Sequence, residues 1–411
     1  MAKLQNVRGT YDLYGEAKRK MKKVTSVGSE VVEKYGFEEI ETPIFEFTEV
    51  FSRNLGETSD VVTKEMYCFE DRGGESLTLR PEGTAGVARS FISEGMQQNL
   101  PVKLYYSGPM FRYERPQKGR QRQFTQFGCE LLGVETPQAD IEVIAMAYEF
   151  LEKLGLTGSV TVEINSLGDR ESRDAYREKL VAYLKSRYDE LSEDSKTRLE
   201  RNPLRVLDSK EECDKAVVED APLYKDSLNE ASSAFFNAVL KGLDNLGIKY
   251  KVNDRLVRGL DYYSHTVFEL VTDKLGSQGT VLAGGRYDGL VEQMGGGKVA
   301  GIGWACGVER LSMLLEADVS LPRPIAVIPV GEDVNDKAVE IAYQLRRAGF
   351  RVEHGYSGNL KKRMMKANKV NAVKAVIIGS DELSKGEATL KDLDSGAQKN
   401  VALDKIVEEL R

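Results

Sequence analysis

The chain has 411 residues, with 58 lysines and arginines against 65 aspartates and glutamates, a formal net charge of −7, and 41% hydrophobic residues. At roughly 100–200 residues per domain, this length predicts two or three domains, each with its own core. The composition excludes a disordered, collagen-like or coiled-coil protein. No signal peptide and no apolar run of the roughly 18–20 residues needed to cross a bilayer is readable, so we expect a cytoplasmic protein with no membrane segment.

The cysteines and histidines limit the metal chemistry that the chain can support. No two of the four cysteines lie within four positions of each other, which predicts neither a disulfide framework nor a zinc site; they are Cys68, Cys129, Cys213 and Cys306. The only histidines are His265 and His354. His265 lies on an alternating stretch and is expected to pack or to hydrogen-bond rather than to bind a ligand.

The first 320 residues predict an α+β domain with antiparallel strands. A helix is expected over 21–35, ending at Gly36. Strands are expected in the segments SLTLRPE, VKLYYSGPMFRYE and RQFTQFGCELLG, joined by polar or glycine-containing turns. Long charged helical stretches then dominate, and we interpret residues 167–248 as a helical insertion within this domain.

Two prolines near residues 321–324 indicate a linker, and the pattern then changes. Strands and helices alternate over 325–411, with a hairpin around Asp394 and Gly396 and a last helix over 404–410. Such alternation predicts a small α/β domain.

A basic hairpin over residues 111–130 is the strongest candidate for a functional site. Arginines and lysines crowd its loop beside one acid, Glu114. Alternation along the second strand places Gln126, Gly128 and Glu130 on one face, where the glycine predicts a small gap between an amide and a carboxylate. Such a gap suits an amine-bearing ligand, while the arginines suit phosphates or nucleic acid. The plainer alternative is a solvated basic hairpin.

Glycines mark a second candidate over residues 299–315. Gly301, Gly303, Ala305 and Gly307 would give a strand one flat face on which a planar ring could lie, and Arg310 would follow at the start of a helix. Tight packing of sheet against helix explains the glycines equally well.

Three further segments carry functional side chains. Arg258, Asp261, Tyr262 and Tyr263 cluster before a predicted strand, and the glycine-rich AGGRYDGL segment follows it. In RPEGTA, Glu82 and Thr84 either cap the next helix or grip an ammonium group. Residues 355–380 contain six bases and no acid, a pattern that favours contact with a polyanion over a merely solvated face.

Taken together, these segments resemble the histidyl-tRNA synthetases, a family of class II aminoacyl-tRNA synthetases. FRYER…RQF resembles motif 2 of the class, and GIGWACGVERL resembles motif 3. LVRGLDYY and AGGRYDGL resemble the two peptides peculiar to the histidyl enzymes, and the likeness extends over essentially the whole chain. The sequence departs from the common pattern at Tyr113 and Thr125, where many members have histidine.

The resemblance implies roles for individual residues. Histidine would be bound by Glu82, Thr84, Gln126, Glu130, Tyr262 and Tyr263. ATP would be bound by Arg112, Glu114, Arg120, Gly303 and Arg310, and the catalytic residues would be Arg258, Arg112 and Arg310. The tRNA would contact Arg115, Gln117, Lys118 and Arg122 in the motif 2 loop, and Lys361, Lys362 and Arg363 near the anticodon.

The implied activity is histidine–tRNA ligation. The enzyme would activate L-histidine with Mg²⁺-bound ATP and transfer it to the 3′-terminal adenosine of tRNA(His), without a zinc or other protein-bound metal. The family also implies a homodimer formed around residues 21–47. Two alternatives stay open: a non-catalytic regulatory paralogue of ATP phosphoribosyltransferase, and a class II synthetase for proline, threonine or glycine.

Overall fold

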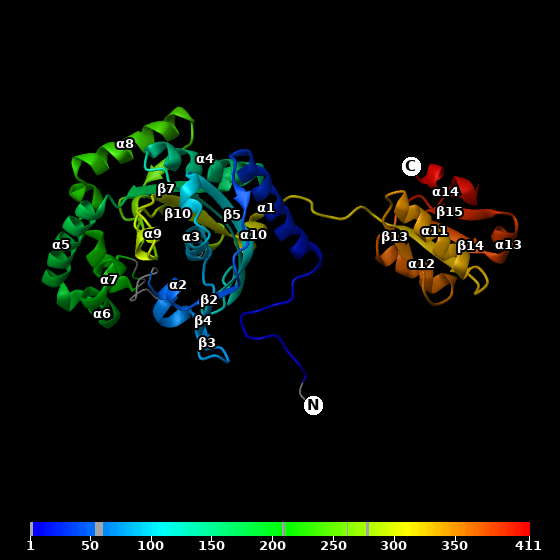
Figure 1. Ribbon diagram of the computed structural model, residues 1–411. Helices are drawn as coiled ribbons and strands as arrows, with labels where there is room; N and C mark the ends of the chain where they lie inside the picture. The colour runs from blue at the N-terminus through cyan, green and yellow to red at the C-terminus, as the bar shows by residue number, and fades with distance from the viewer. Residues whose placement is uncertain (1–2, 54–60, 208, 210, 261, 277–278) are drawn as a thin grey trace. The chain divides into compact units, whose positions relative to one another are not determined.

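The computed structural model describes residues 3–53, 61–207, 209, 211–260, 262–276 and 279–411. The chain divides into two compact units, Met1–Val319 and Ser320–Arg411, which we call the N-terminal and C-terminal units (Figure 1). Asp261, singled out in the sequence, lies outside the described residues.

A large sheet organises the N-terminal unit. Within the described residues eight strands form it, in the order β1-β5-β6-β11-β10-β9-β7-β8. All neighbours pair antiparallel except β1 with β5 and β7 with β8. The strands are β1 (Glu38–Glu39), β5 (Val102–Phe111), β6 (Gln123–Leu132), β7 (Thr161–Ser166), β8 (Tyr250–Val252), β9 (Ser264–Val271), β10 (Thr280–Arg286) and β11 (Gly301–Gly307). The antiparallel α+β prediction is therefore confirmed.

Helices bury one face of this sheet. The alternating side chains Phe127 and Cys129 of β6 and Trp304 of β11 are fully or almost fully buried in a core built with four helices. These helices are α1 (Gly15–Lys34), α4 (Pro137–Lys153), α8 (Glu230–Asn245) and α10 (Val308–Leu314). The polar residues of the same strands therefore face the opposite side.

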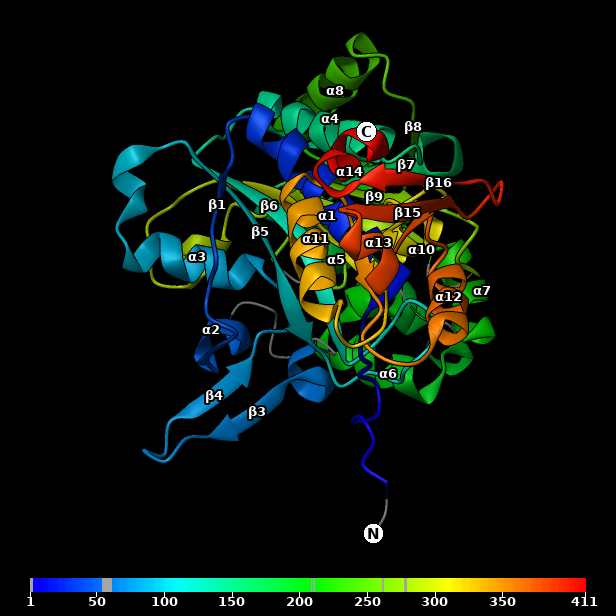
Figure 2. The same ribbon diagram turned by 90° about the vertical axis from the view of Figure 1, so that its right-hand side faces the viewer.

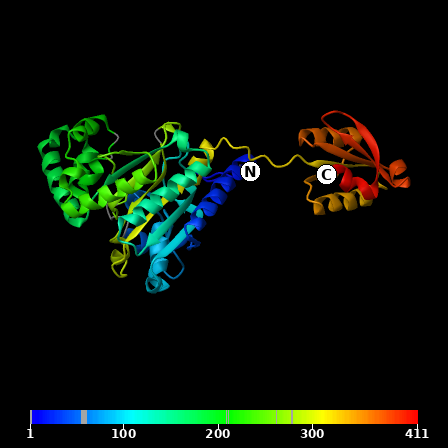
Figure 3. The same cartoon turned by 90° about the horizontal axis from the view of Figure 1, so that it is seen from above.

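The charged stretch after β7 folds into helices, most of which gather at one end of the N-terminal unit (Figure 3). Those at this end are α5 (Arg170–Ser186), α6 (Glu193–Arg201) and α7 (Glu212–Glu219), with the 3₁₀ turns η4 (Tyr188–Glu190), η5 (Pro203–Val206) and η6 (Tyr224–Ser227). Helix α8, which ends the stretch, packs on the large sheet instead. The side chains of Asp169, Ser192 and Asn229 cap α5, α6 and α8. We call residues 170–227 the insertion; its apolar side chains share one core with Tyr262 and Tyr263.

A small three-stranded sheet projects from the large one (Figure 2). It has the antiparallel order β2 (Phe45–Phe47), β4 (Ser76–Leu79), β3 (Tyr67–Glu70). Short elements complete the unit: α2 (Glu49–Ser52), η1 (Val61–Glu65), α3 (Thr84–Ser93), η2 (Met96–Asn99), η3 (Thr157–Ser159) and α9 (Leu290–Gln293). Helix α3 follows β4 directly and begins beside the site described below.

The C-terminal unit has the α/β fold expected from its sequence. Its described strands form a sheet in the order β13-β12-β14-β15-β16, parallel among the first three and antiparallel afterwards. The strands are β12 (Ile325–Val330), β13 (Val352–His354), β14 (Lys374–Gly379), β15 (Glu387–Asp392) and β16 (Gln398–Ala402). The helices are α11 (Asn335–Arg347), α12 (Leu360–Lys369), α13 (Ser380–Ser384), η8 (Leu403–Lys405) and α14 (Ile406–Leu410).

Candidate active site

A cavity of about 360 Å³ opens on the polar side of the large sheet. Every residue that the sequence assigned to histidine binding, ATP binding or catalysis lines it. These residues are Glu82, Thr84, Arg112, Glu114, Arg120, Gln126, Glu130, Arg258, Tyr262, Tyr263, Gly303 and Arg310. The fold thus brings together residues from the start of α3, the β5–β6 loop, β6, β11, α10 and the segment before β9.

Strand register places Glu130 on the floor of the cavity. Glu130 lies opposite Gly303 in the β6–β11 pair, and a Cβ atom at Gly303 would approach the Glu130 Oε2 to 2.0 Å. A side chain at position 303 would therefore displace the carboxylate. The flat face predicted for β11 is correspondingly shorter than expected, because Glu130 covers Gly303 and the ring of Tyr287 covers Gly301.

Glu130 is buried and already hydrogen-bonded. Its Oε1 accepts from the hydroxyls of Thr84 at 2.7 Å and Tyr106 at 3.4 Å, and its Oε2 accepts from the Tyr287 hydroxyl at 2.5 Å. Burial raises the pKa of Glu130 to about 8, with the charge of Glu82 adding to the rise and the three hydroxyls opposing it. The free protein therefore holds this carboxyl partly protonated near neutral pH.

The gap predicted above Gly128 is not a ligand space. Tyr106 is the direct partner of Gly128 in the β5–β6 pair, and a Cβ atom at Gly128 would lie 2.5 Å from the Tyr106 hydroxyl. The missing side chain instead makes room for this ring. Gln126 does reach the cavity, and its buried Oε1 has no hydrogen-bond partner among the described residues.

Glu82 begins α3. Its carboxylate accepts from the backbone N–H of Thr84 at 2.9 Å and of Ala85 at 2.7 Å, so the helix-capping alternative is present in the structure. Burial raises the pKa of Glu82, although both backbone bonds and Arg112 act in the opposite direction. A carboxylate has about four acceptor positions, so capping leaves two of them for another donor.

The segment before β9 supplies Arg258 and both tyrosines. Arg258 forms an ion pair with Glu269 of β9 and lies 5.5 Å from the centre of the Tyr263 ring. Burial alone would lower the pKa of Arg258, but the charge of Glu269 outweighs it and the pKa is raised. Burial raises the pKa of Tyr263, opposed by Arg258 and by a hydrogen bond from Tyr262.

Guanidinium groups gather at the other end of the cavity. Arg112 donates its Nε–H to the Pro81 carbonyl at 2.9 Å, and Arg310 donates to the carbonyls of Gly119 at 3.0 Å and Thr280 at 2.8 Å. Burial lowers the pKa of Arg310, and so do the positive charges of its neighbours Arg120 and Arg112.

A carboxylate only partly offsets the repulsion among these arginines. Arg120 pairs with Glu114 at 2.7 Å. Cations held close together in this way form a site for a multiply charged anion.

The residues assigned to tRNA lie outside this cavity. On the β5–β6 loop Arg115, Gln117 and Lys118 are exposed, while Arg122 is half-buried with its guanidinium 3.8 Å from the centre of the Tyr113 ring. In the C-terminal unit Lys361 and Lys362 are exposed at the start of α12, whereas Arg363 is half-buried and donates to the backbone carbonyl of Pro329.

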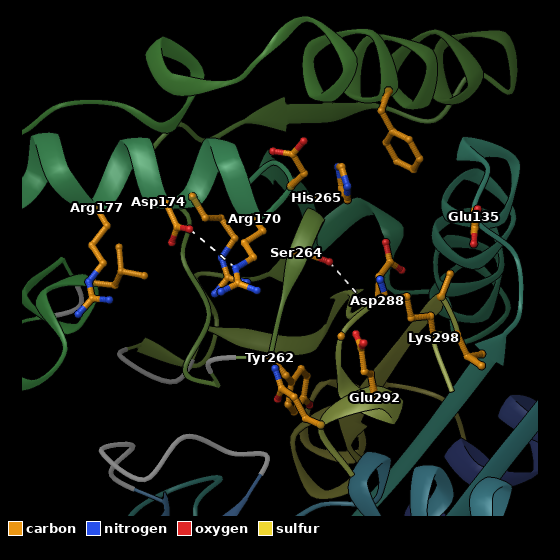
Figure 4. A pocket seen from close by; sticks show the side chains of 18 of the residues that line it. Glu135, Arg170, Asp174, Arg177, Tyr262, Ser264, His265, Asp288, Glu292 and Lys298 are labelled. Carbon is orange, nitrogen blue, oxygen red and sulfur yellow. Dashed lines mark hydrogen bonds and ion pairs between the residues drawn. The ribbon is translucent and has the colours of Figure 1, made fainter. Parts of the chain in front are cut away.

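A larger cavity of about 1040 Å³ lies between the insertion and the body of the unit (Figure 4). Arg170 and Arg177 of α5 line one wall, and Asp288 lines the facing wall. His265 also lines it and packs against the Phe235 ring in a tilted arrangement, with the ring centres 4.9 Å apart. Tyr262, by contrast, lines both cavities.

Sequence reasoning left two residues of AGGRYDGL without a role. The Tyr287 hydroxyl donates to Glu130. The one indication of this role in the sequence was that Tyr287 lies in a glycine-rich segment between two charged residues. Arg286 forms an ion pair with Asp140, both side chains being 0% exposed, and a second with Asp288 at 3.0 Å. Arg286 is thus part of the scaffold, and no feature of the sequence paired it with Asp140.

Among the described residues, no group of three or more histidine, cysteine, aspartate or glutamate side chains is arranged to hold a metal ion. No described helix combines the length and the apolar composition needed to span a membrane.

Comparison with known families identifies the chain. Residues 9–311 match the family model for histidyl-tRNA synthetase. The chain belongs to the histidyl-tRNA synthetase family. Residues 324–411 match the anticodon binding domain model, which confirms a class II synthetase catalytic domain followed by an anticodon-binding domain.

Relatives of this synthetase match over nearly the full length of both chains. The histidine–tRNA ligase of Rhodospirillum rubrum is 59% identical over 98% of this chain and 97% of its own. That of Gluconacetobacter diazotrophicus is 53% identical over 100% and 99%. The structure of apo S. aureus histidyl-tRNA synthetase superposes with a TM-score of 0.82 and 37% identity, covering 99% of each chain.

Proposed function

We propose that this synthetase activates L-histidine with ATP to histidyl-adenylate and transfers histidine to the 3′-terminal adenosine of tRNA(His). The observation that carries the proposal is the convergence in one cavity of an acidic, phenol-rich end and a guanidinium-rich end. The first end suits an amino acid with an imidazole side chain, and the second suits a triphosphate.

The ammonium group of histidine would bind at the start of α3. Among the described residues the buried Gln126 Oε1 has no hydrogen-bond partner, and the described contacts leave Glu82 two acceptor positions. The Thr84 hydroxyl donates its proton to Glu130, so its oxygen can accept from a third ammonium hydrogen. Three acceptors match the three N–H donors of an ammonium group.

The imidazole ring would lie between Glu130 and Tyr263. When Glu130 is ionised, the described hydroxyls occupy three of its about four acceptor positions, which leaves one for an imidazole N–H. Tyr263 accepts from Tyr262, so its own proton is available for the second ring nitrogen. A side chain without these nitrogens would leave buried polar groups unpaired, which disfavours it strongly.

ATP would bind across the arginine-rich end. Arg112 and Arg310 would hold the phosphates, and Arg258 would stabilise charge on the α-phosphate as the histidine carboxylate attacks it in line. Pyrophosphate would then leave. Mg²⁺ enters as part of the ATP substrate, and the carboxylates of Glu269 and Glu309 in the same cavity are ligands of the type it prefers.

The tRNA would engage both units. Arg115, Gln117 and Lys118 on the exposed β5–β6 loop suit the acceptor end, and the exposed lysines of α12 suit the phosphates near the anticodon. We also propose that the enzyme works in the cytoplasm.

We further propose a homodimer. Phe45, Phe47 and Phe69 of the small sheet are 53%, 56% and 44% exposed, and such apolar exposure favours burial against a second copy. Sedimentation equilibrium at micromolar concentration tests this; a monomer throughout would contradict it.

The regulatory paralogue is disfavoured by the match of both units to histidine–tRNA ligases. The direct test is ATP–pyrophosphate exchange with each of the twenty amino acids, followed by charging of tRNA(His). Exchange with histidine alone, followed by charging, is expected. Exchange with proline, threonine or glycine, or no exchange at all, would contradict the proposal.

A further inference from the structure

The segment that carries Arg258 into the cavity has little structure of its own. Between β8 and β9, residues 253–260, 262 and 263 form neither helix nor strand. The position of the guanidinium therefore depends on contacts that this segment makes with other parts of the fold. Most of the partners outside the large sheet come from the insertion.

The insertion first holds the segment upstream of Arg258. Asp254 pairs with Lys225 of η6 at 2.7 Å. Arg255 donates to the carbonyl of Glu219 at the end of α7, at 2.7 Å, and to that of Pro222 beyond it, at 3.2 Å. These contacts fix the chain three and four positions before the catalytic arginine.

A second hold lies immediately after Arg258. Arg205, within η5 of the insertion, donates from Nη2 to the carbonyl oxygen of Gly259. The two residues are 54 positions apart in the sequence. This hydrogen bond therefore connects the insertion directly to the segment that carries Arg258. Arg205, Arg258 and Tyr263 are also among the residues that line one small cavity of about 20 Å³, so the insertion and the segment lie against each other here.

We infer that Arg205 is a positioning residue for Arg258. Gly259 has no side chain to pack, so its carbonyl is the group through which the insertion can hold the backbone next to Arg258. Releasing this carbonyl would let the guanidinium drift from the position that stabilises charge in adenylate formation. The inference rests on the proposed function, because it assumes that Arg258 acts in that step.

The expected signature is a loss of rate rather than of substrate affinity. A displacement of about 1 Å at a group that acts on the transition state costs on the order of 100-fold in rate. The acceptors proposed for the histidine ammonium group come from β6 and from the start of α3, whereas the contact that Arg205 makes with the segment is at Gly259. Tyr262 and Tyr263, proposed to bind beside the imidazole, lie on the β9 side of Arg258 and pack in one core with Tyr287. Histidine binding should therefore persist.

The test compares Arg205→Ala, Arg205→Lys and the control Arg201→Ala. Arg201 is an exposed residue four positions earlier, at the end of α6. Adenylate formation is measured by single-turnover kinetics on enzyme quantified by active-site titration, and the histidine Kd by equilibrium titration. We expect Arg205→Ala to lose at least tenfold in rate with a Kd within about threefold, Arg205→Lys to recover part of the loss, and Arg201→Ala to match the wild type.

A double-mutant cycle shows whether Arg205 acts through Arg258. Adding Arg205→Ala to Arg258→Ala should slow adenylation less than twofold further, since the group being positioned is already gone. A full additional tenfold loss, an equal loss in Arg201→Ala, or a parallel loss of histidine affinity would overturn the inference. Rates are compared with whichever amino acid the wild type activates, so failure of the proposed specificity is a separate outcome.

Discussion

Replacing Glu130 by glutamine should change how the stability of the free enzyme depends on pH. Glutamine resembles the protonated carboxyl in shape and keeps one acceptor and one donor among the surrounding hydroxyls. Because burial raises the pKa of Glu130 from its ordinary value of 4.5 to about 8, the folded state holds a proton that the unfolded chain has released. This contribution to stability is complete below pH 4.5 and is lost as the pH rises towards 8.

The structure sets the size of the effect. Glu130 is 1% exposed, so solvent screening does not reduce the shift. Between these two pKa values, the free energy of unfolding falls by about 1.4 kcal/mol for each unit by which the pH rises. From pH 5.5 to pH 7.5 the free energy of unfolding of the wild type should thus fall by about 2.7 kcal/mol more than that of Glu130→Gln. Any pH-independent effect of the substitution on stability cancels in this comparison.

The single tryptophan provides the assay. Trp304 lies in β11, buried beside the site, and reports unfolding of the N-terminal unit in urea. Free energies of unfolding are measured for both proteins at pH 5.5 and 7.5 without ligand. A difference between the two proteins that stays constant within about 0.5 kcal/mol over this range would refute the raised pKa and the reasoning built on it.

Three other substitutions test separate parts of the site. Arg258→Ala should lower the rate of adenylate formation by on the order of 100-fold, with the histidine Kd within threefold; equal losses in both would contradict its role on the α-phosphate. Gly303→Ala should abolish ATP–pyrophosphate exchange and lower the free energy of unfolding by about 1–3 kcal/mol, because its Cβ would lie 2.0 Å from a carboxylate oxygen. The control Gly297→Ala, with open space around it, should leave both thermal unfolding and exchange unchanged. Replacing both Lys361 and Lys362 by alanine should raise the KM for tRNA about tenfold and leave ATP–pyrophosphate exchange unchanged; altered exchange would argue against a tRNA contact.

Much of the fold could be predicted because its signals are local. The β5–β6 hairpin follows from alternation, and the strands and helices of the C-terminal unit follow from their periods. At its hairpin, Asp392 accepts from the backbone of Asp394 and Ser395, as turn residues commonly do. The assignment of the site residues depended on motif resemblance, since the residues alone left a solvated hairpin and a packing strand as alternatives.

The expectation of a ligand gap above Gly128 was wrong because of the strand register. Alternation correctly placed Gly128 on the face of Glu130, but it could not show that Tyr106 lies directly opposite that glycine and fills the gap. The bond between Tyr287 and Glu130 joins residues 157 positions apart and likewise depends on how β10, β11 and β6 align. Pairing between distant strands is set by tertiary packing, which composition and spacing do not report.

The buried pair of Arg286 and Asp140 constrains how this family can diverge. Losing Arg286 would leave the fully buried Asp140 without its cation, at a cost of about 3–5 kcal/mol, and losing Asp140 would leave Arg286 with Asp288 as its one described ionic partner. An apolar pair of similar volume can be close to neutral. A substitution at either position alone would therefore destabilise the fold. Substitutions at the two positions should therefore arise together along any lineage, as a compensated exchange rather than as two independent events.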